Sequence, residues 1–213
     1  MALRELDLEE QEKLEELKAW WKRHGGLLIL VIAAVAIAFA GTAGWRWYER
    51  DQAMRAGALY STLLKAAQSA DAKAVREAGG TLAEDYARTL YASMGALAAA
   101  HFYFERGELK SAKAQLQWVL ERSPSAEFQA LARLRLAALL LDEKGFDEAL
   151  AMLGDVPRAP YAAQFAAMRG DVLSAKGERD GARAAYRRAL ETSDAEGAAF
   201  RDSVQMRLDA LEG

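Results

Sequence analysis

Length, composition and charge exclude several classes of protein. The chain has 213 residues and a formal net charge of −3, with acids and bases interspersed, so it lacks the basic surface that nucleic-acid binding requires. It contains no cysteine, which excludes disulfides, thiolate metal sites and cysteine nucleophiles. Its two histidines, His24 and His101, are far apart in the sequence and match no metal-binding motif, so both are interpreted as structural, with His101 partly buried on a helix. We therefore expect no enzymatic activity, cofactor or metal.

Residues 1–24 form an expected N-terminal segment with two faces. Leu14, Leu17 and Trp21 follow helical spacing on one face. Acidic residues form the other face: Glu9, Glu12, Glu15 and Glu16. Because anionic lipid repels acidic side chains, a membrane-lying helix is disfavoured. Two interpretations stay open, a cytosolic docking helix and a solvated lead-in to the segment that follows.

Residues 25–47 are predicted to form one transmembrane helix. Between Arg23 and Arg46 the chain runs for 22 residues without an acid, a lysine or an arginine. At roughly 1.5 Å per residue this stretch reaches about 30 Å, the thickness of a bilayer's hydrocarbon core. Aromatic and basic residues of the kind that anchor a helix at the two membrane interfaces flank it. These anchors are Trp20, Trp21, Lys22 and Arg23 on one side, and Trp45, Arg46, Trp47 and Tyr48 on the other.

A cleavable secretory signal is the alternative interpretation of this segment. Ala38-Phe39-Ala40 before Gly41 would serve as a small-residue cleavage site. However, 26 residues precede Leu27, and acids outnumber bases among them, whereas a signal peptide begins with a short basic region. A retained anchor fits better. Four basic residues closely precede the apolar segment and three closely follow it. Because basic residues favour the cytoplasmic side of a membrane, this difference slightly favours a cytoplasmic N-terminus.

Small residues recur along the predicted span. Ala36, Ala40 and Gly44 fall at every fourth position, which would place them on one face of the helix. Such a ridge lets a second transmembrane helix approach closely, although an alanine-rich segment also produces it by chance. The ridge is a possible helix-packing face.

Residues 48–213 are predicted to form one all-α domain. The segment is rich in Ala, Leu, Glu, Arg and Lys, and its apolar residues recur at helical rather than strand spacing. Breaks are expected at Gly79-Gly80, Gly107, Ser123-Pro124, Gly145, Pro157 to Pro160, Gly177 and Gly197. Two further helices are expected within residues 48–90, and a capping helix over residues 196–212.

Three comparable units, centred on Ala112, Ala149 and Ala182, lie 37 and 33 residues apart. This period matches the roughly 34 residues of tetratricopeptide repeats, and predicts an α-solenoid of helical hairpins. The middle unit is degenerate, because Gly145 comes one position late. The repeat positions are interpreted as scaffold, while the curved inner surface of the stack would bind a partner. They are Ala100, Tyr103, Gly107 and Ala112, then Ala149, then Gly170, Gly177, Ala182, Tyr186 and Ala189.

The whole chain resembles the YfgM family. The resemblance is carried by Leu14 to Lys22 with its paired tryptophans, by the span exit Gly44-Trp45-Arg46-Trp47-Tyr48, and by Ala56 to Tyr60. The unit from Gly170 to Ala189 is also similar to that family's last repeat. One departure is His24-Gly25-Gly26, where the family usually has a polar turn followed by lysine.

The resemblance implies a single-span inner-membrane protein of a Gram-negative bacterium with a tetratricopeptide-like periplasmic domain. It implies an ancillary subunit of the SecYEG translocon that works beside the membrane-anchored chaperone PpiD and contacts newly translocated proteins. A second hypothesis is a membrane-anchored assembly factor that holds one specific apoprotein, as in cytochrome maturation. The sequence alone locates no binding residues for either.

Overall fold

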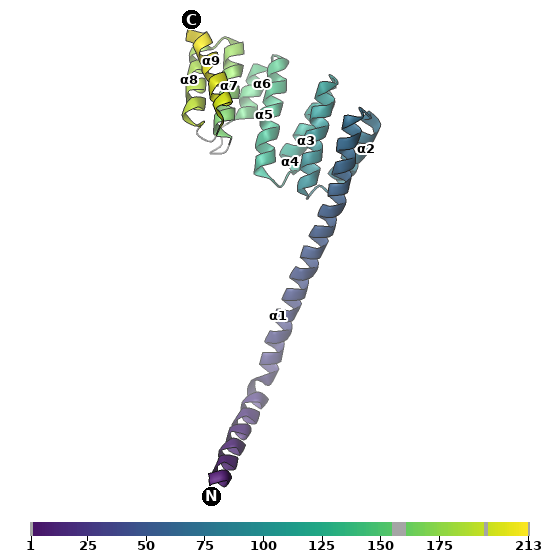
Figure 1. Ribbon diagram of the computed structural model, residues 1–213, viewed down its shortest axis with the longest axis vertical. Helices are drawn as coiled ribbons and strands as arrows, with labels where there is room; N and C mark the ends of the chain where they lie inside the picture. The colour runs from purple at the N-terminus through teal and green to yellow at the C-terminus, as the bar shows by residue number, and fades with distance from the viewer. Residues whose placement is uncertain (1, 155–160, 194–195, 213) are drawn as a thin grey trace. The chain divides into compact units, whose positions relative to one another are not determined.

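The computed structural model describes residues 2–154, 161–193 and 196–212, and over these residues the fold is all-helical, as predicted. The chain divides into two compact units, Met1–Asp51 and Gln52–Gly213. The helices, labelled in Figure 1, are α1 (Ala2–Gln68), α2 (Ala72–Asp85), α3 (Leu90–Glu105), α4 (Leu109–Arg122), α5 (Ala126–Asp142), α6 (Phe146–Leu153), α7 (Ala162–Lys176), α8 (Arg179–Glu191) and α9 (Ala198–Glu212).

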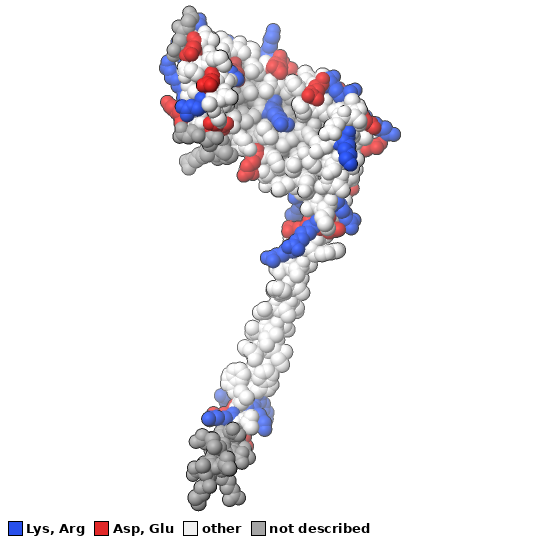
Figure 2. Space-filling view, in the orientation of Figure 1, with Lys and Arg blue, Asp and Glu red and all other residues white. Residues whose placement is uncertain are grey.

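The first unit consists of the greater part of α1. From Leu27 to Phe39 the large apolar side chains, apart from half-buried Leu28, are exposed rather than packed, with Leu27 71% and Phe39 75% accessible. Among the described residues α1 is the one helix long and apolar enough to cross a bilayer, and none of its most apolar window is buried by protein. Figure 2 shows this stretch as an uncharged rod with Lys and Arg at both ends. An unpacked apolar surface of this length fits a helix that crosses a bilayer.

The helix does not end where the apolar stretch ends. Residues 48–55 contain neither glycine nor proline, and α1 continues through them and through Gly57 to Gln68. The first of the two helices expected within residues 48–90 is therefore the end of α1, and the second is α2. The break expected at Gly79-Gly80 was wrong, because both residues lie inside α2. A methyl group added at Gly79 would lie 3.6 Å from Leu63, an ordinary van der Waals contact, so packing against α1 does not require glycine there.

The second unit is a stack of helical hairpins. Helices α3 and α4, α5 and α6, and α7 and α8 pack as successive pairs, and α9 packs on α8 (Figure 1). A central apolar cluster extends from the end of α1 to α7, with Leu116, Leu136 and Phe165 among its buried members. A second cluster joins α7, α8 and α9. The end of α1, α2 and α3 share a third cluster around Leu63 and Leu82.

The turn within each hairpin has the same geometry. Gly107, Lys144 and Gly177 adopt left-handed backbone angles, with φ of 73°, 63° and 88°. The amide of the following residue then donates to a carbonyl five residues back, from Glu108 to Tyr103, Gly145 to Leu140 and Glu178 to Leu173, at 2.9, 2.8 and 2.9 Å. The middle repeat thus keeps the turn of its neighbours, and Lys144 takes the position that glycine occupies in the others. The expected proline break at Pro157 to Pro160 lies outside the described residues.

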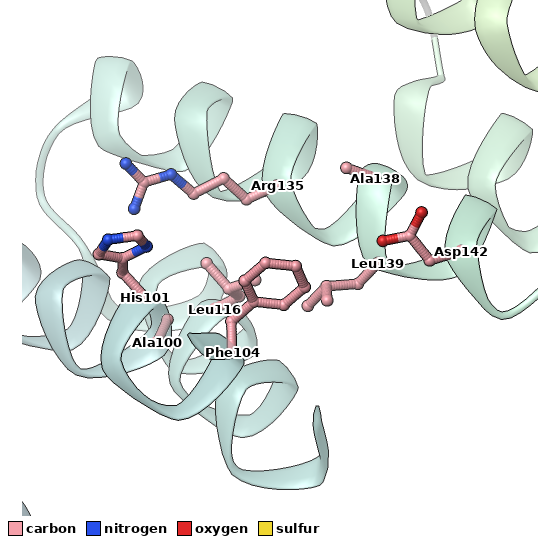
Figure 3. A pocket seen from close by; sticks show the side chains of 8 residues that line it. All are labelled: Ala100, His101, Phe104, Leu116, Arg135, Ala138, Leu139 and Asp142. Atoms are coloured by element: carbon pink, nitrogen blue, oxygen red, sulfur yellow. The ribbon is translucent and has the colours of Figure 1, made fainter. Parts of the chain in front are cut away.

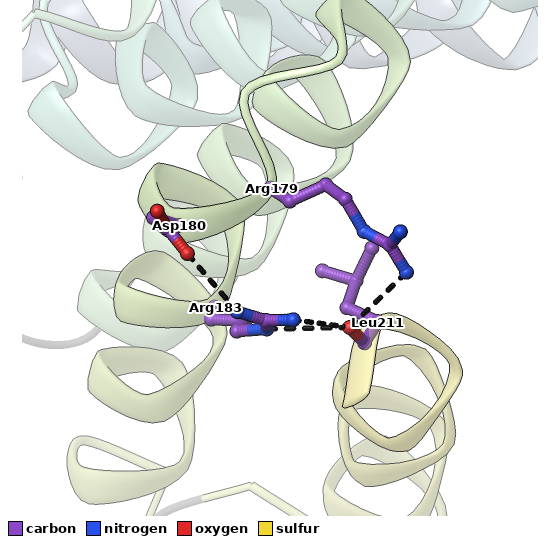
Figure 4. A network of polar contacts seen from close by, with 4 residues as sticks. All are labelled: Arg179, Asp180, Arg183 and Leu211. Atoms are coloured by element: carbon purple, nitrogen blue, oxygen red, sulfur yellow. Dashed lines mark hydrogen bonds and ion pairs between the residues drawn. The ribbon is translucent and has the colours of Figure 1, made fainter. Parts of the chain in front are cut away.

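Polar contacts fix the ends of two elements. The buried hydroxyls of Ser93 in α3 and Ser123 after α4 are hydrogen-bonded at 2.8 Å, which satisfies both groups in an otherwise apolar setting. At the last helix, Arg183 donates from Nε and Nη2 to the Leu211 carbonyl at 3.2 and 2.7 Å, and Arg179 donates to the same oxygen (Figure 4). Asp180 holds the Arg183 guanidinium from the other side. These cations satisfy a carbonyl at the negative end of the α9 dipole.

Candidate interaction surface

A hollow in the described part of the second unit lies between α3 and α5. It is a cavity of about 230 Å³ that opens to solvent. Its apolar lining combines residues of α3, α4 and α5. These residues are Ala100, Phe104, Leu116, Ala138 and Leu139. In Figure 3, Phe104 and Leu139 approach each other across the hollow, and Leu116 lies between their helices.

Charged groups stand at the two ends of this hollow. Arg135 and His101 lie at one end and Asp142 at the other (Figure 3). One nitrogen of Arg135, Nη1, donates to the Leu97 carbonyl at 3.2 Å. No carboxylate among the described residues pairs with Arg135. Packing against α3 lowers the pKa of the Arg135 guanidinium, since burial disfavours the charged form, although an arginine remains protonated.

A second, shallower hollow shares His101 and Arg135 with the first. It measures about 300 Å³ and is bounded by Tyr60 at the end of α1, by Met94, Leu97 and Ala98 in α3, and by Arg135. The Tyr60 ring lies 6.0 Å, centroid to centroid, from the ring of Tyr91. The two hollows, one between α3 and α5 and one between the end of α1 and α3, therefore meet at Arg135.

The predicted role of His101 as a partly buried residue was wrong. Its side chain is 64% exposed, and Nε2 lies 3.3 Å from a carboxylate oxygen of Glu105 one turn along α3. The adjacent Phe102 and Tyr103 take the buried positions instead. His101 therefore lies on the rim of both hollows.

The predicted repeat residues lie in the interior and at the turns. Gly107 and Gly177 take the left-handed turn positions described above. Gly170 lies against the Tyr186 ring, whose hydroxyl donates to Asp171 at 2.8 Å. Burial, together with Asp171, raises the pKa of Tyr186 above its ordinary value. The remaining members are buried: Ala100, Tyr103, Ala112, Ala149, Ala182 and Ala189.

The predicted membrane anchors all lie exposed on α1. Trp20 stacks near His24, with ring centroids 5.4 Å apart, and Trp45 donates from Nε1 to Glu49 at 2.8 Å. The Trp21 ring covers Gly25, where an added methyl group would lie 3.1 Å from it. The other anchors, likewise exposed, are Lys22, Arg23, Arg46, Trp47 and Tyr48.

The small residues of the predicted packing face are open. Ala36, Ala40 and Gly44 are all exposed, and a methyl group added to Gly44 would meet nothing within 4 Å. Leu14 and Leu17 of the N-terminal segment are exposed as well. The side chains of Glu9 and Glu12, assigned to the acidic face of that segment, lie outside the described residues.

Sequence reasoning missed the residues that define the hollow. The available signal was a helix face on α5 in which Arg135 and Asp142, seven residues apart, enclose Ala138 and Leu139. Within the described residues, no group of three or more His, Cys, Asp or Glu side chains is arranged to hold a metal ion.

Comparison with known proteins places this architecture in a family. Residues 18–213 match the model of a tetratricopeptide repeat-like domain. The chain is 30% identical over 206 residues to a Neisseria gonorrhoeae protein named ancillary SecYEG translocon subunit, which covers 96% of this chain and 98% of that protein. Proteins of the same name from Haemophilus influenzae and Escherichia coli are 28% and 26% identical, over 87% and 95% of this chain and 90% and 96% of their own lengths.

No solved structure matches the chain significantly. The agreement with the family model and with these relatives extends from the apolar helix through the last repeat. This chain belongs to the ancillary SecYEG translocon subunit family, whose members carry a tetratricopeptide repeat-like domain.

Proposed function

We propose that this protein is a membrane-anchored ancillary subunit of the Sec translocon. The apolar part of α1 would hold it in the inner membrane with its N-terminus in the cytoplasm, and the helical hairpins would lie in the periplasm. There the repeat domain would bind other proteins, among them a PpiD-like membrane chaperone and newly translocated chains. No catalytic step is part of this role.

One observation carries the proposal. The similarity to ancillary SecYEG translocon subunits covers 96% of this chain, so it includes the apolar helix and the repeat domain together. A resemblance confined to the hairpins would fit many helical scaffolds, whereas joint coverage favours the same combination of anchor and scaffold. The apolar hollow between α3 and α5 supports a protein-binding role for the scaffold.

Affinity purification tests the proposal. The tagged full chain, extracted from membranes in a mild detergent, should recover SecYEG together with a PpiD-like chaperone. A matched control replaces residues 25–47 with an unrelated spanning helix of equal length, so that the protein still inserts into the membrane. Partners lost in this control contact the span, and partners retained contact the hairpins. Recovery of cytochrome-maturation proteins without Sec components would overturn the proposal.

The proposed topology has its own test. Because the chain contains no cysteine, single cysteines can be introduced without background. Lys18→Cys and Met206→Cys place a thiol at exposed positions on either side of the apolar stretch. A membrane-impermeant maleimide, added to cells with a permeabilised outer membrane, should label the second variant and leave the first unlabelled until the inner membrane is broken. Labelling in the opposite order would refute the periplasmic assignment.

A further inference from the structure

The α5 face of the hollow carries a defined charge pattern. Arg135 and Asp142 are seven residues apart in one helix, which is about 10 Å along its axis and close to two full turns. They therefore lie on the same face, with Ala138 and Leu139 between them. Figure 3 shows this order across the hollow, with the cation at one end and the carboxylate at the other.

Arg135 has hydrogen-bonding capacity left for a ligand. Its guanidinium carries five N–H donors, of which Nη1 contacts the Leu97 carbonyl at 3.2 Å. No described carboxylate neutralises it, and its neighbours in the hollow are His101 and apolar residues, while part of the arginine stays exposed. A guanidinium partly removed from water and lacking a counter-ion attracts an anionic group, most favourably a planar carboxylate.

The apolar centre of the hollow matches one side chain rather than a cofactor. At about 230 Å³ it is smaller than the roughly 300–1,000 Å³ of typical small-molecule sites. Phe104 leaves 45% of its surface exposed at this point, although most large apolar residues of the hairpins are buried or half-buried. Covering it with an apolar side chain of a partner would remove that surface from water.

We propose that this hollow binds an extended polypeptide segment in which an apolar side chain stands between an acidic residue, paired with Arg135, and a basic residue, paired with Asp142. In an extended β conformation, residues i, i+2 and i+4 lie on one side of the chain, with i and i+4 about 13 Å apart. An acid and a base at the outer positions can then reach Arg135 and Asp142 while the middle side chain enters the hollow. The recognised pattern is an acid and a base four positions apart with an apolar residue midway between them. This inference rests on the proposed protein-binding role and specifies its ligand.

A coupled set of substitutions tests the pairing with Arg135. Fluorescein-labelled decapeptides carrying Glu, Leu and Lys in this pattern are titrated with the full-length chain in lipid nanodiscs, and binding is followed by anisotropy. Replacing the peptide's Glu with Gln should weaken binding about threefold to fivefold for the natural chain, as expected for a partly exposed ion pair. With the Arg135→Gln chain, the same peptide change should have no effect.

The basic end is tested in the same way. Lys to Gln in the peptide should weaken binding by a similar factor for the natural chain and have no effect with Asp142→Asn. For Arg135→Gln, the matched control is Arg133→Gln, because it also removes a positive charge from α5 but lies on a surface that does not line this hollow. Ala138→Phe should block the hollow and abolish binding, with an unchanged circular dichroism spectrum as the check on folding.

The outcomes separate this inference from the proposed function. If replacing the peptide's Glu with Gln weakens binding equally for the natural chain and the Arg135→Gln chain, the assignment of the hollow is wrong. In that case the translocon role stands if the chain still recovers SecYEG. Absence of saturable binding, or self-association abolished by Ala138→Phe, also overturns the peptide assignment. Failure to recover any Sec component removes the proposed function whatever the peptides do.

Discussion

The contact between Gly170 and Tyr186 gives the tightest constraint on a single residue in the repeat domain. A methyl group added at Gly170 would lie 2.4 Å from the tyrosine ring, well inside van der Waals contact. The ring is buried and its hydroxyl is bonded to Asp171, so it has little freedom to move. Close packing of α7 on α8 therefore requires glycine at this position.

We expect Gly170→Ala to destabilise the domain by about 1–3 kcal/mol, the usual cost of overpacking a rigid core. The measurement is the free energy of unfolding of the full chain in detergent, followed by circular dichroism in urea. Gly80→Ala is the matched control, since it lies within α2 and its added methyl group meets nothing within 4 Å. That control should be neutral or stabilising by up to about 1 kcal/mol. Equal losses in both variants would contradict the packing argument.

Lys144 supports a second prediction at the residue scale. Its φ of 63° is the left-handed geometry that Gly107 and Gly177 provide in the neighbouring hairpins. A residue with a Cβ pays about 1–2 kcal/mol for this conformation, and glycine avoids that cost but loses more entropy on folding. Lys144→Gly should therefore stabilise the chain by about 0.5–1 kcal/mol, seen as a higher Tm.

The reverse change serves as its counterpart. Gly177 has φ of 88° and open space around it, so Gly177→Ala tests backbone strain without steric contact. We expect a loss of about 1 kcal/mol. A Tm that falls in Lys144→Gly would show that the lysine side chain contributes more than its backbone costs.

At the scale of the element, arginine side chains of α8 hold the C-terminal end of α9. Arg183 and Arg179 both donate to the Leu211 carbonyl, and Asp180 orients the Arg183 guanidinium at 3.0 Å. Val204 and Leu208 supply the apolar contact of α9 with the rest of the stack. The helix is thus held by a small apolar face and by a charged cap at its C-terminal end.

Arg183→Gln should loosen α9 while leaving the other helices intact. Loss of the charge-assisted contacts should cost about 1 kcal/mol, reduced by the partial exposure of the side chain. Hydrogen exchange measured by mass spectrometry should be about fivefold faster in α9 and unchanged in α3 and α5. Arg188→Gln, an exposed change on α8, is the control and should leave α9 protection unaltered. Uniformly faster exchange would argue against a local cap.

Helices and turns could be predicted largely because they depend on local chemistry. Gly107 and Gly177 marked turns because each precedes a new apolar period, and both adopt positive φ. Gly79 and Gly80 carry the same residue type, yet α2 continues through them because Val75, Ala78 and Leu82 maintain one buried face. In this helix tertiary packing overrides the local preference of glycine. The same override lets Lys144 complete a turn that its sequence does not favour.

The hollow could not be predicted, because its residues come together through packing. Phe104 and Arg135 are 31 positions apart and meet only when α3 and α5 lie side by side. Along the sequence, Arg135 is one of many arginines on exposed helix faces. Only the folded chain shows that Arg135 lies at the edge of an apolar hollow and that no described carboxylate pairs with it. The scaffold positions, by contrast, recur with the period of the repeat and were recognisable in sequence.

At the scale of the whole molecule, the open small-residue face of α1 bears on assembly. Ala36, Ala40 and Gly44 are exposed, so a bulky side chain there creates no internal clash. If a partner helix packs on this face, Ala40→Leu should reduce recovery of translocon components severalfold while membrane insertion persists. The measurement is quantitative mass spectrometry of tagged complexes. The matched control is Ala38→Leu, because Ala38 lies about 200° around the helix from Ala40. Unchanged recovery in both variants would indicate that the span is a plain anchor.

The division of the hairpin stack into clusters also has a mechanical consequence. The hollow lies within the cluster that extends to α7, whereas α8 and α9 belong to the separate C-terminal cluster. Tension applied to the last helix, for example by a protein being drawn past it, would first load the contact of α9 with α8. Residues from Ala100 to Asp142 would keep their arrangement meanwhile, so α9 can yield to load without releasing a bound segment.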